Sequence, residues 1–277
     1  MIRRPSIAIA LLLVLAGCGG LAGPADEQRT VNPNLAGAPS ATATPDPTED
    51  YPPGVSADGV DARELANAHV AALEDRPNAV RVHTTVVAAN GTTLVSRTAT
   101  TRENGSRSSV SLVTDGAAPA FLGDVGDYAY WSDGNETLVR QEQWNGSVEH
   151  GTLPGDSEPA IGFTDTGRSV VEPALLAREF RYVGTERRGN ATYHVLTADA
   201  GTVERDERAD ARNYRLTVAV TPEGVVESMT TRYDTARDGV EFTYVQRFRV
   251  SDVDGTTVDR PAWADEVMGN VTATTTP

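Results

Sequence analysis

The heptapeptide YRLTVAV, residues 214–220, alternates large apolar side chains with polar or small ones. In an extended chain, one side carries Tyr214, Leu216, Val218 and Val220. Arg215 and Thr217 fall on the other side. A period of two residues is that of a β-strand with one buried face and one solvated face. The stretch therefore predicts a half-buried strand.

The same alternation recurs in residues 80–86, VRVHTTV, where Arg81 and His83 fall opposite the valines. In residues 241–250, the apolar set is Phe242, Tyr244, Phe248 and Val250, against Glu241, Arg247 and Arg249. Turn dipeptides separate such segments, at Asn90-Gly91, Asn104-Gly105, Asp133-Gly134, Asn145-Gly146, Gly189-Asn190, Glu223-Gly224 and Asp238-Gly239. Because these dipeptides favour tight hairpins, the sequence predicts an antiparallel sheet.

A helical period appears in residues 64–75, ELANAHVAALED. This stretch is opened by Asp61-Ala-Arg-Glu64, which resembles a capping box. This predicts an amphipathic helix over 61–75 that ends before Pro77. A second helix is expected over 169–180, with Pro173 in its first turn, and a short helical turn over 261–267.

The N-terminus has the layout of a secretory signal peptide. Arg3 and Arg4 precede ten apolar residues, 7–16, and small residues follow. Ten residues are too few to cross a bilayer, which needs roughly 20. Residues 1–17 are therefore predicted to be a lipoprotein signal peptide, exported by the general secretory route or, given the paired arginines, by the twin-arginine route.

The chain has a single cysteine, in the segment Leu15-Ala16-Gly17-Cys18. This segment resembles a lipobox, in which cleavage leaves the cysteine as a new N-terminus whose sulfur carries a lipid. With no second thiol in the sequence, Cys18 cannot form a disulfide within the chain. We predict that Cys18 is lipidated and that membrane lipid is a partner through it.

Residues 18–57 are rich in Pro, Ala, Thr and Gly and have almost no large apolar residues. Such a segment buries too little area to offset its conformational entropy, so we expect a disordered tether. Residues 58–270 are then expected to form a single β-rich domain, and 271–277 a flexible tail.

The lipobox, tether, helix and sheet follow one another in an order that resembles the bacterial lipoprotein-carrier and mycobacterial lipoglycan-carrier lipoproteins. Together with AWADEV near the C-terminus, the pattern also looks like an uncharacterised haloarchaeal lipoprotein family. The resemblance implies a β-dominated α+β fold. In it, a curled, half-barrel-like antiparallel sheet carries the N-terminal and mid-chain helices on its concave face. It also implies lipid or acyl-chain binding between sheet and helices.

Composition narrows the class of partner. All 24 basic residues are arginine, against 39 acidic residues, and the formal net charge is −15. Such a chain repels nucleic acid, so no nucleic-acid partner is expected. At about 1 M salt the Debye length is roughly 3 Å, which screens the self-repulsion. The composition is therefore typical of a halophilic archaeon, with an acidic protein from GC-rich DNA as the alternative.

Six Asn-x-Ser/Thr triplets are candidate N-glycosylation sites: Asn90, Asn104, Asn135, Asn145, Asn190 and Asn270. About two would be expected by random placement, so the excess fits an exported glycoprotein. Three of these asparagines precede glycine, however, and Asn-Gly is a favoured hairpin turn. Glycan attachment and turn formation both remain open for these positions.

No catalytic motif is evident. The histidines His69, His83, His150 and His194 lack metal-ligand spacing, and neither a nucleophile elbow nor a phosphate-binding glycine loop occurs. His69 is expected at the surface or boundary of its helix. We therefore predict no catalytic residues, no metal site and no cofactor. An enzyme would need histidines and carboxylates to converge in one cleft.

Four aromatic residues, Tyr128, Tyr130, Trp131 and Trp144, are candidates for lining an apolar pocket, although core packing explains them equally well. Taken together, the sequence predicts a non-enzymatic protein, lipid-anchored on the extracellular face of the cell membrane. It would bind an apolar ligand or lipid in a cleft between sheet and helices. The alternative is a glycosylated surface interaction or structural module without a ligand cavity.

Overall fold

The computed structural model describes residues 50–116, 125–154, 166–176, 179–203, 211–237 and 239–267. The strands are β1 Val55–Ser56, β2 Gly59–Val60, β3 Asn78–Ala88, β4 Thr93–Asn104, β5 Arg107–Gly116, β6 Val125–Ser132, β7 Glu136–Gln143, β8 Val148–Pro154, β9 Arg181–Arg188, β10 Ala191–Val203, β11 Ala211–Val220, β12 Val226–Arg237 and β13 Val240–Ser251. The helices are α1 Ala62–Leu73 and α2 Arg168–Leu176. Within the described ranges, neither helix has the length and apolar character needed to cross a bilayer.

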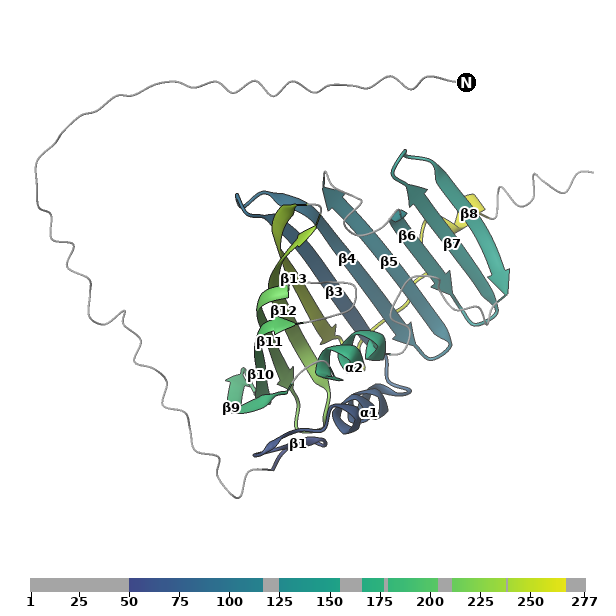
Figure 1. Ribbon diagram of the computed structural model, residues 1–277. Helices are drawn as coiled ribbons and strands as arrows, with labels where there is room; N and C mark the ends of the chain where they lie inside the picture. Colours follow the sequence, from purple (N-terminus) through teal and green to yellow (C-terminus); the bar gives the residue numbers. More distant parts are fainter. Residues whose placement is uncertain are drawn as a thin grey trace, which may run out of the picture. The chain divides into compact units, whose positions relative to one another are not determined.

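Eleven of the described strands form one sheet, in the order β8-β7-β6-β5-β4-β3-β13-β12-β11-β10-β9. Neighbours are consecutive in the chain except β3 and β13, which pair from Ala88 opposite Phe242 to Ala79 opposite Ser251. Figure 1 shows the sheet curling toward β9, with α1 and α2 on the inside of the curl at one end. This arrangement confirms the predicted β-dominated α+β fold with both helices on the concave face.

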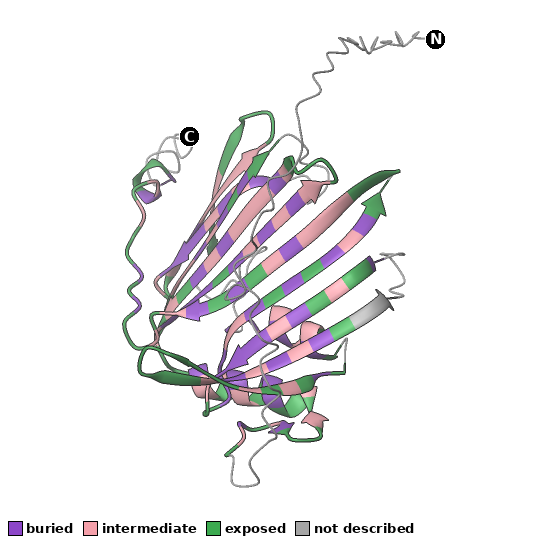
Figure 2. Ribbon diagram, turned by 90° about the vertical axis from the view of Figure 1, so that its left-hand side faces the viewer, coloured by how far each residue is buried: buried purple, intermediate pink, exposed green. Residues whose placement is uncertain are grey.

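Six of the seven hairpin predictions are confirmed by the strand order, and Asp238 of the seventh, Asp238-Gly239, lies outside the described residues. Asn90-Gly91, Asn104-Gly105, Asp133-Gly134, Asn145-Gly146, Gly189-Asn190 and Glu223-Gly224 all fall where one described strand gives way to the next. In each pair the glycine has a positive φ, which a side chain would disfavour. Along the strands, buried residues alternate with exposed ones, as Figure 2 shows. The alternation leaves the concave face apolar beneath the helices.

Helix α1 begins where the sequence predicts. The Asp61 side chain accepts hydrogen bonds from the backbone N–H groups of Arg63 and Glu64, both at 3.0 Å. In a capping box the side chain of Glu64 would accept a hydrogen bond from the Asp61 backbone N–H. Here that N–H donates instead to the Gly54 carbonyl at 2.8 Å. The cap therefore also ties α1 to the segment that precedes it.

Helix α2 ends at Leu176, before the predicted end at residue 180, and the place of Pro173 within it also differs from the prediction. It begins at Arg168, so Pro173 is the sixth residue of the helix and not part of the first turn. Proline has no N–H to donate to the carbonyl four residues earlier, here that of Ser169. Val171 and Leu175 are buried, so the helix keeps its apolar side on the sheet despite the proline. Tertiary packing therefore outweighs the local cost.

Two further apolar clusters lie on the other half of the sheet. On the concave face of β4 to β6 the cluster consists of Ala99, Val110, Leu112, Tyr128 and Tyr130. On the convex face, the C-terminal segment covers β6 and β7, where Trp131 and Leu138 pack against Val258, Ala264 and Val267. The predicted helical turn over 261–267 contributes Ala264 and Val267 to this convex cluster.

The folded chain starts earlier than predicted. Residues 50–57, assigned to the tether from their composition, include β1, and Val55 belongs to the main core. Tyr51 packs against the same core, with its ring centroid 5.0 Å from that of Tyr182. The composition of residues 50–57 does not indicate this packing, because the apolar residues occur singly among prolines and glycines. The signal peptide, Cys18 and the tail over 271–277 lie outside the described residues.

Candidate functional site

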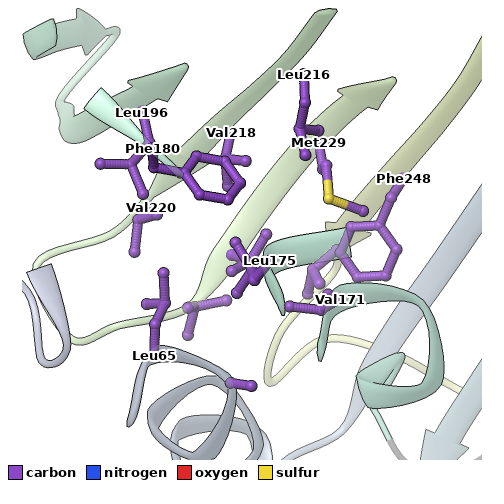
Figure 3. Close-up of a cluster of buried hydrophobic side chains, with 14 of the residues drawn as sticks. Leu65, Val171, Leu175, Phe180, Leu196, Leu216, Val218, Val220, Met229 and Phe248 are labelled. Carbon is purple, nitrogen blue, oxygen red and sulfur yellow. The ribbon is translucent and has the colours of Figure 1, made fainter. Parts of the chain in front are cut away.

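The space beneath the two helices is filled. The core there brings together Leu65 of α1, Val171 and Leu175 of α2, and the concave side chains of β3 and β10 to β13. Figure 3 shows Phe180, Met229 and Phe248 among the side chains that meet in this cluster. Leu175 is fully buried, and Phe248 is only 1% exposed. The described side chains directly under α1 and α2 therefore pack against one another and fill this part of the interior.

His69 joins three elements at this end of the core. Its side chain is fully buried, which corrects the prediction of a surface or boundary position. Nδ1 accepts the Val226 backbone N–H at 3.1 Å, so Nε2 carries the proton and donates to the Thr166 carbonyl at 3.0 Å. The helical period placed His69 correctly on α1, but its burial depends on partners 97 and 157 residues away.

Gly167 sets how closely α2 approaches the sheet. It has φ +87°, and a Cβ there would lie 2.5 Å from Cε2 of Phe248. Its carbonyl accepts the N–H groups of Val170 and Val171, both at 3.0 Å, and so begins the helix. Glycine is therefore required for both backbone conformation and close packing.

Beside the filled core, a groove of about 210 Å³ opens between α2 and the concave face. Its lining residues are Ser169, Val170, Pro173 and Ala174 of α2 with Tyr214, Thr231, Tyr233, Tyr244 and Gln246 of the sheet. Ligand pockets for whole drug-sized molecules are usually 300–1,000 Å³, so a groove of this size suits one segment of a ligand.

Three tyrosines from adjacent strands form the floor of this groove. The rings of Tyr214 and Tyr233 are stacked with centroids 6.2 Å apart, and those of Tyr233 and Tyr244 are stacked at 4.8 Å. A bulge in β11 at Asn213, with φ +54°, keeps Tyr214 on the concave face. The alternation in the sequence placed each tyrosine on its face, but the stack depends on the pairing of β11, β12 and β13.

Gln246 is a polar residue of the groove lining, whereas Arg97 lies outside that lining. The Gln246 amide donates to the Tyr244 hydroxyl at 3.0 Å. Arg97 donates to the Thr114 hydroxyl at 3.0 Å, and its guanidinium interacts electrostatically with Tyr244. Burial lowers the pKa of Arg97 from its usual value. The groove lining thus combines aromatic faces with the amide of Gln246 and the hydroxyls of Ser169 and Thr231.

The structure separates the four aromatic residues predicted to line a pocket. Tyr128 and Tyr130 lie together on the concave face, in the cluster on β4 to β6. Trp131 faces the convex side, and Trp144 lies in the β7–β8 turn with 38% of its surface exposed. A different pocket of about 360 Å³ borders Tyr130 and Trp131 beneath the C-terminal segment. The tyrosines of the groove were not among the predicted lining residues.

All the candidate glycosylation asparagines in the described ranges are exposed at hairpin turns. They are Asn90, Asn104, Asn135, Asn145 and Asn190, and Asn270 lies outside those ranges. The Nδ2 atom that a glycan would occupy is engaged in Asn104, where it donates to the Thr256 carbonyl at 3.0 Å. Asn90 and Asn145 accept hydrogen bonds through Oδ1 from residues two positions later, as turn asparagines do.

The histidines do not converge. His83 lies on the convex face of β3, whereas His194 lies on the concave face of β10, where its ring nitrogen is 3.2 Å from the Tyr182 hydroxyl. His150 is on β8, and His69 is committed to the core. Among the described residues, no three His, Cys, Asp or Glu side chains are grouped to hold a metal ion.

The sequence matches no protein-family description and no curated protein. Among solved structures, it is similar to the lipoprotein LprF of Mycobacterium bovis, at 12% identity, over 73% of this chain and 97% of that one, with a TM-score of 0.37. The lipoprotein LppX of Mycobacterium tuberculosis matches at 13% identity, over 72% and 98% of the two chains, with a TM-score of 0.35. A putative outer membrane lipoprotein-sorting protein domain of Vibrio parahaemolyticus matches at 11% identity, over 76% and 99%, with a TM-score of 0.25. These similarities are too weak to assign a function to this chain, so the function is argued from its own residues.

Proposed function

We propose that this chain is a lipid-anchored, non-enzymatic protein of the extracellular face of the cell membrane, which binds one segment of an apolar ligand or lipid in the groove beside α2. The observation that carries the proposal is the tyrosine floor. Tyr214, Tyr233 and Tyr244 present stacked rings toward Val170, Pro173 and Ala174 of α2 across about 210 Å³ of space.

The proposal accounts for the partial exposure of these aromatic residues. Tyr214 and Tyr244 are half-buried, although the core beside them is closed to solvent. An acyl segment lying against the rings would remove this apolar surface from water, worth about 25 cal/mol per Å². Lipidation of Cys18 would hold the protein at the membrane that supplies such a ligand.

The test is native mass spectrometry of the protein purified from its host membrane at high salt, in parent and Cys18→Ala forms. An apolar mass that remains bound in the Cys18→Ala form is expected, because the groove and the anchor are separate sites. Ala174→Phe would place a ring in the groove, and this variant should lose the mass.

Leu176→Phe is the matched control, because Leu176 is on the same helix, is 50% exposed and does not line the groove. It should retain the bound mass. If the only lipid disappears with Cys18, or if Ala174→Phe still carries the ligand, the groove is not the binding site.

The second candidate is a glycosylated surface interaction module without a ligand. It is favoured by the position of Asn90, Asn135, Asn145 and Asn190, which are exposed in four different turns. A protein that carries glycan masses on these turns, with no apolar mass in either form, would support this candidate instead.

A further inference from the structure

The convex face of four adjacent strands carries a band of exposed arginines, which we name the arginine band. Its members are Arg81 of β3, Arg215 of β11, Arg232 of β12, and Arg247 and Arg249 of β13. Each lies beside a concave residue of the core, as Arg247 and Arg249 flank Phe248. The band is notable in a chain whose formal net charge is −15.

Strand register places like charges directly opposite one another within the band. Arg249 is the partner of Arg81 across β13 and β3, and Arg215 is the partner of Arg232 across β11 and β12. Directly opposed like charges destabilise a sheet. Nothing in the fold requires arginine here, because exposed positions on a strand accept Thr, Ser or Gln equally well.

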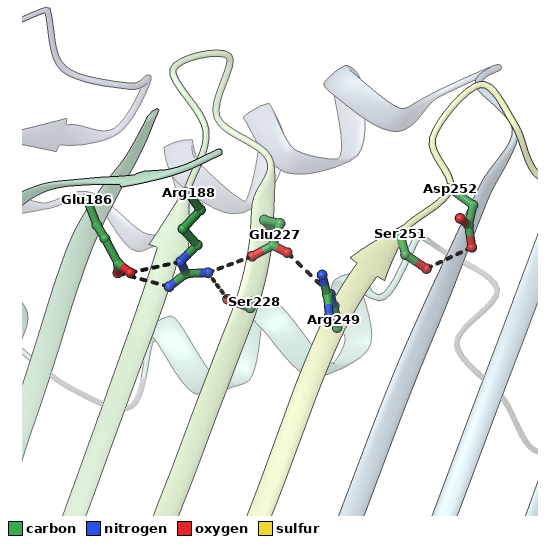
Figure 4. Close-up of polar contacts among 7 residues, drawn as sticks. All are labelled: Glu186, Arg188, Glu227, Ser228, Arg249, Ser251 and Asp252. Carbon is green, nitrogen blue, oxygen red and sulfur yellow. Dashed lines mark hydrogen bonds and ion pairs between the residues drawn. The ribbon is translucent and has the colours of Figure 1, made fainter. Parts of the chain in front are cut away.

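Acidic neighbours neutralise only the margins of the band. Glu227 lies 3.3 Å from Arg249 and 3.2 Å from Arg188, a ladder that Figure 4 shows on the face opposite the helices. Asp199 lies 3.4 Å from Arg215. At the centre, within the described part of the chain, neither Arg81 nor Arg247 makes a side-chain hydrogen bond or ion pair.

His83 lies between these two arginines, and its pKa responds to their positive charge. Its pKa is lowered by burial first, and then by the charges of Arg247 and Arg81. Its ring nitrogens lie 3.0 Å from the hydroxyls of Thr98 and Thr85, so the imidazole is held in place in the band. The face therefore offers guanidinium groups and hydroxyl groups together, the donors that bind phosphate oxygens.

We propose that the arginine band binds the anionic headgroups of the membrane, so that the convex face lies on the bilayer surface. The occupant follows from the shape of the array. The backbones of the paired arginines lie about 4.8 Å apart across strands, and those of Arg247 and Arg249 lie about 7 Å apart along β13. The band is therefore an extended surface and not a pocket for one small anion.

The choice of a membrane rests on the proposed anchoring through Cys18. The roughly 30 residues between Cys18 and Asp50 span at most about 100 Å, so an anchored domain stays within reach of the bilayer. A tether of this kind raises the effective concentration of headgroups at the band and makes weak contacts sufficient.

The test uses the full chain carrying Cys18→Ser, so that no lipid holds it to a bilayer. The protein is floated with phosphatidylcholine vesicles, with or without phosphatidylglycerol, at low salt. It should float only with the anionic vesicles. The double variant Arg81→Gln/Arg247→Gln should lose about twentyfold in affinity, since each arginine near an anionic surface contributes about fivefold.

Arg63→Gln/Arg187→Gln is the matched control. It removes the same charge from two exposed arginines outside the band, on α1 and β9, and should change the affinity less than about twofold. Equal losses in both double variants would show an effect of net charge and would overturn the proposal. Absence of flotation with anionic vesicles would overturn it as well.

Two further measurements test whether the arginine band binds something other than a membrane. Release by inorganic phosphate, but not by sodium chloride of equal ionic strength, would indicate a single-phosphate site and contradict membrane docking. Self-association that the band variant abolishes, without vesicle binding, would indicate a second copy of the chain as the occupant. The Ala174→Phe variant should float like its parent, so failure of the groove proposal and failure of the band proposal give different results.

Discussion

On β13, Phe248 and Val250 face the concave core, whereas Arg247 and Arg249 face solvent on the convex side. The same contrast holds on β3, where Val80 and Val82 are buried and Arg81 between them is exposed. The concave face accounts for the stability of the fold, because its apolar side chains leave water. At the arginine band, the convex face opposes arginine to arginine, which destabilises the sheet. Such a face is best explained by what it binds.

The largest effect is expected from Phe248→Ala. Phe248 is 1% exposed, and its ring contacts Gly167 and the first turn of α2, so truncation leaves a cavity between helix and sheet. The free energy of unfolding should fall by about 3–5 kcal/mol. Arg249→Ala, one residue away on the other face, should change it by less than about 0.5 kcal/mol. Denaturant unfolding followed by circular dichroism measures the free energy of unfolding of both variants. Similar losses of stability would contradict the difference between the concave and convex faces.

A smaller loss is expected from His69→Ala. The substitution removes the hydrogen-bond partners of the Val226 N–H and the Thr166 carbonyl, each of which costs about 1–3 kcal/mol when left buried and unpaired. The same unfolding experiment should show a loss of about 2–4 kcal/mol. His83→Ala on the convex face is the control and should cost clearly less. A negligible effect of His69→Ala would mean that water replaces the ring.

The smallest effect concerns the titration of His83. Because its folded pKa is lowered, the unfolded chain takes up this proton first as the pH falls below about 6.5. His83 should therefore reduce stability as the pH is lowered through this range, and His83→Gln should reduce that loss. Burial is the first cause of the shift, so the charges of the band account for only part of it.

Arg81→Gln/Arg247→Gln should raise the pKa of His83 toward its ordinary value. Nuclear magnetic resonance of the imidazole protons measures this pKa. If the two substitutions leave the pKa of His83 unchanged, the charges of Arg81 and Arg247 have little effect at the centre of the arginine band.

The candidate site was predictable only in part. The sequence placed Tyr214 and Tyr244 on the apolar side of their strands, and it placed Pro173 in a helix. It could not show that these residues meet, because β11, β13 and α2 are far apart in the chain. Tyr130 and Trp131, which are neighbours in sequence, belong to clusters on opposite faces of the sheet, although both border the pocket beneath the C-terminal segment.

By itself, the sequence determined the local features. Alternation set the two faces of each strand, Asn-Gly and related pairs set the hairpins, and Asp61 set the start of α1. All of these depend on backbone conformation and on contacts within a few residues. Only the tertiary structure decided the pairing of β3 with β13, the burial of His69 and the opposition of Arg81 to Arg249. These depend on register between distant segments, which is selected by the burial of the whole concave face and not by any single stretch of sequence.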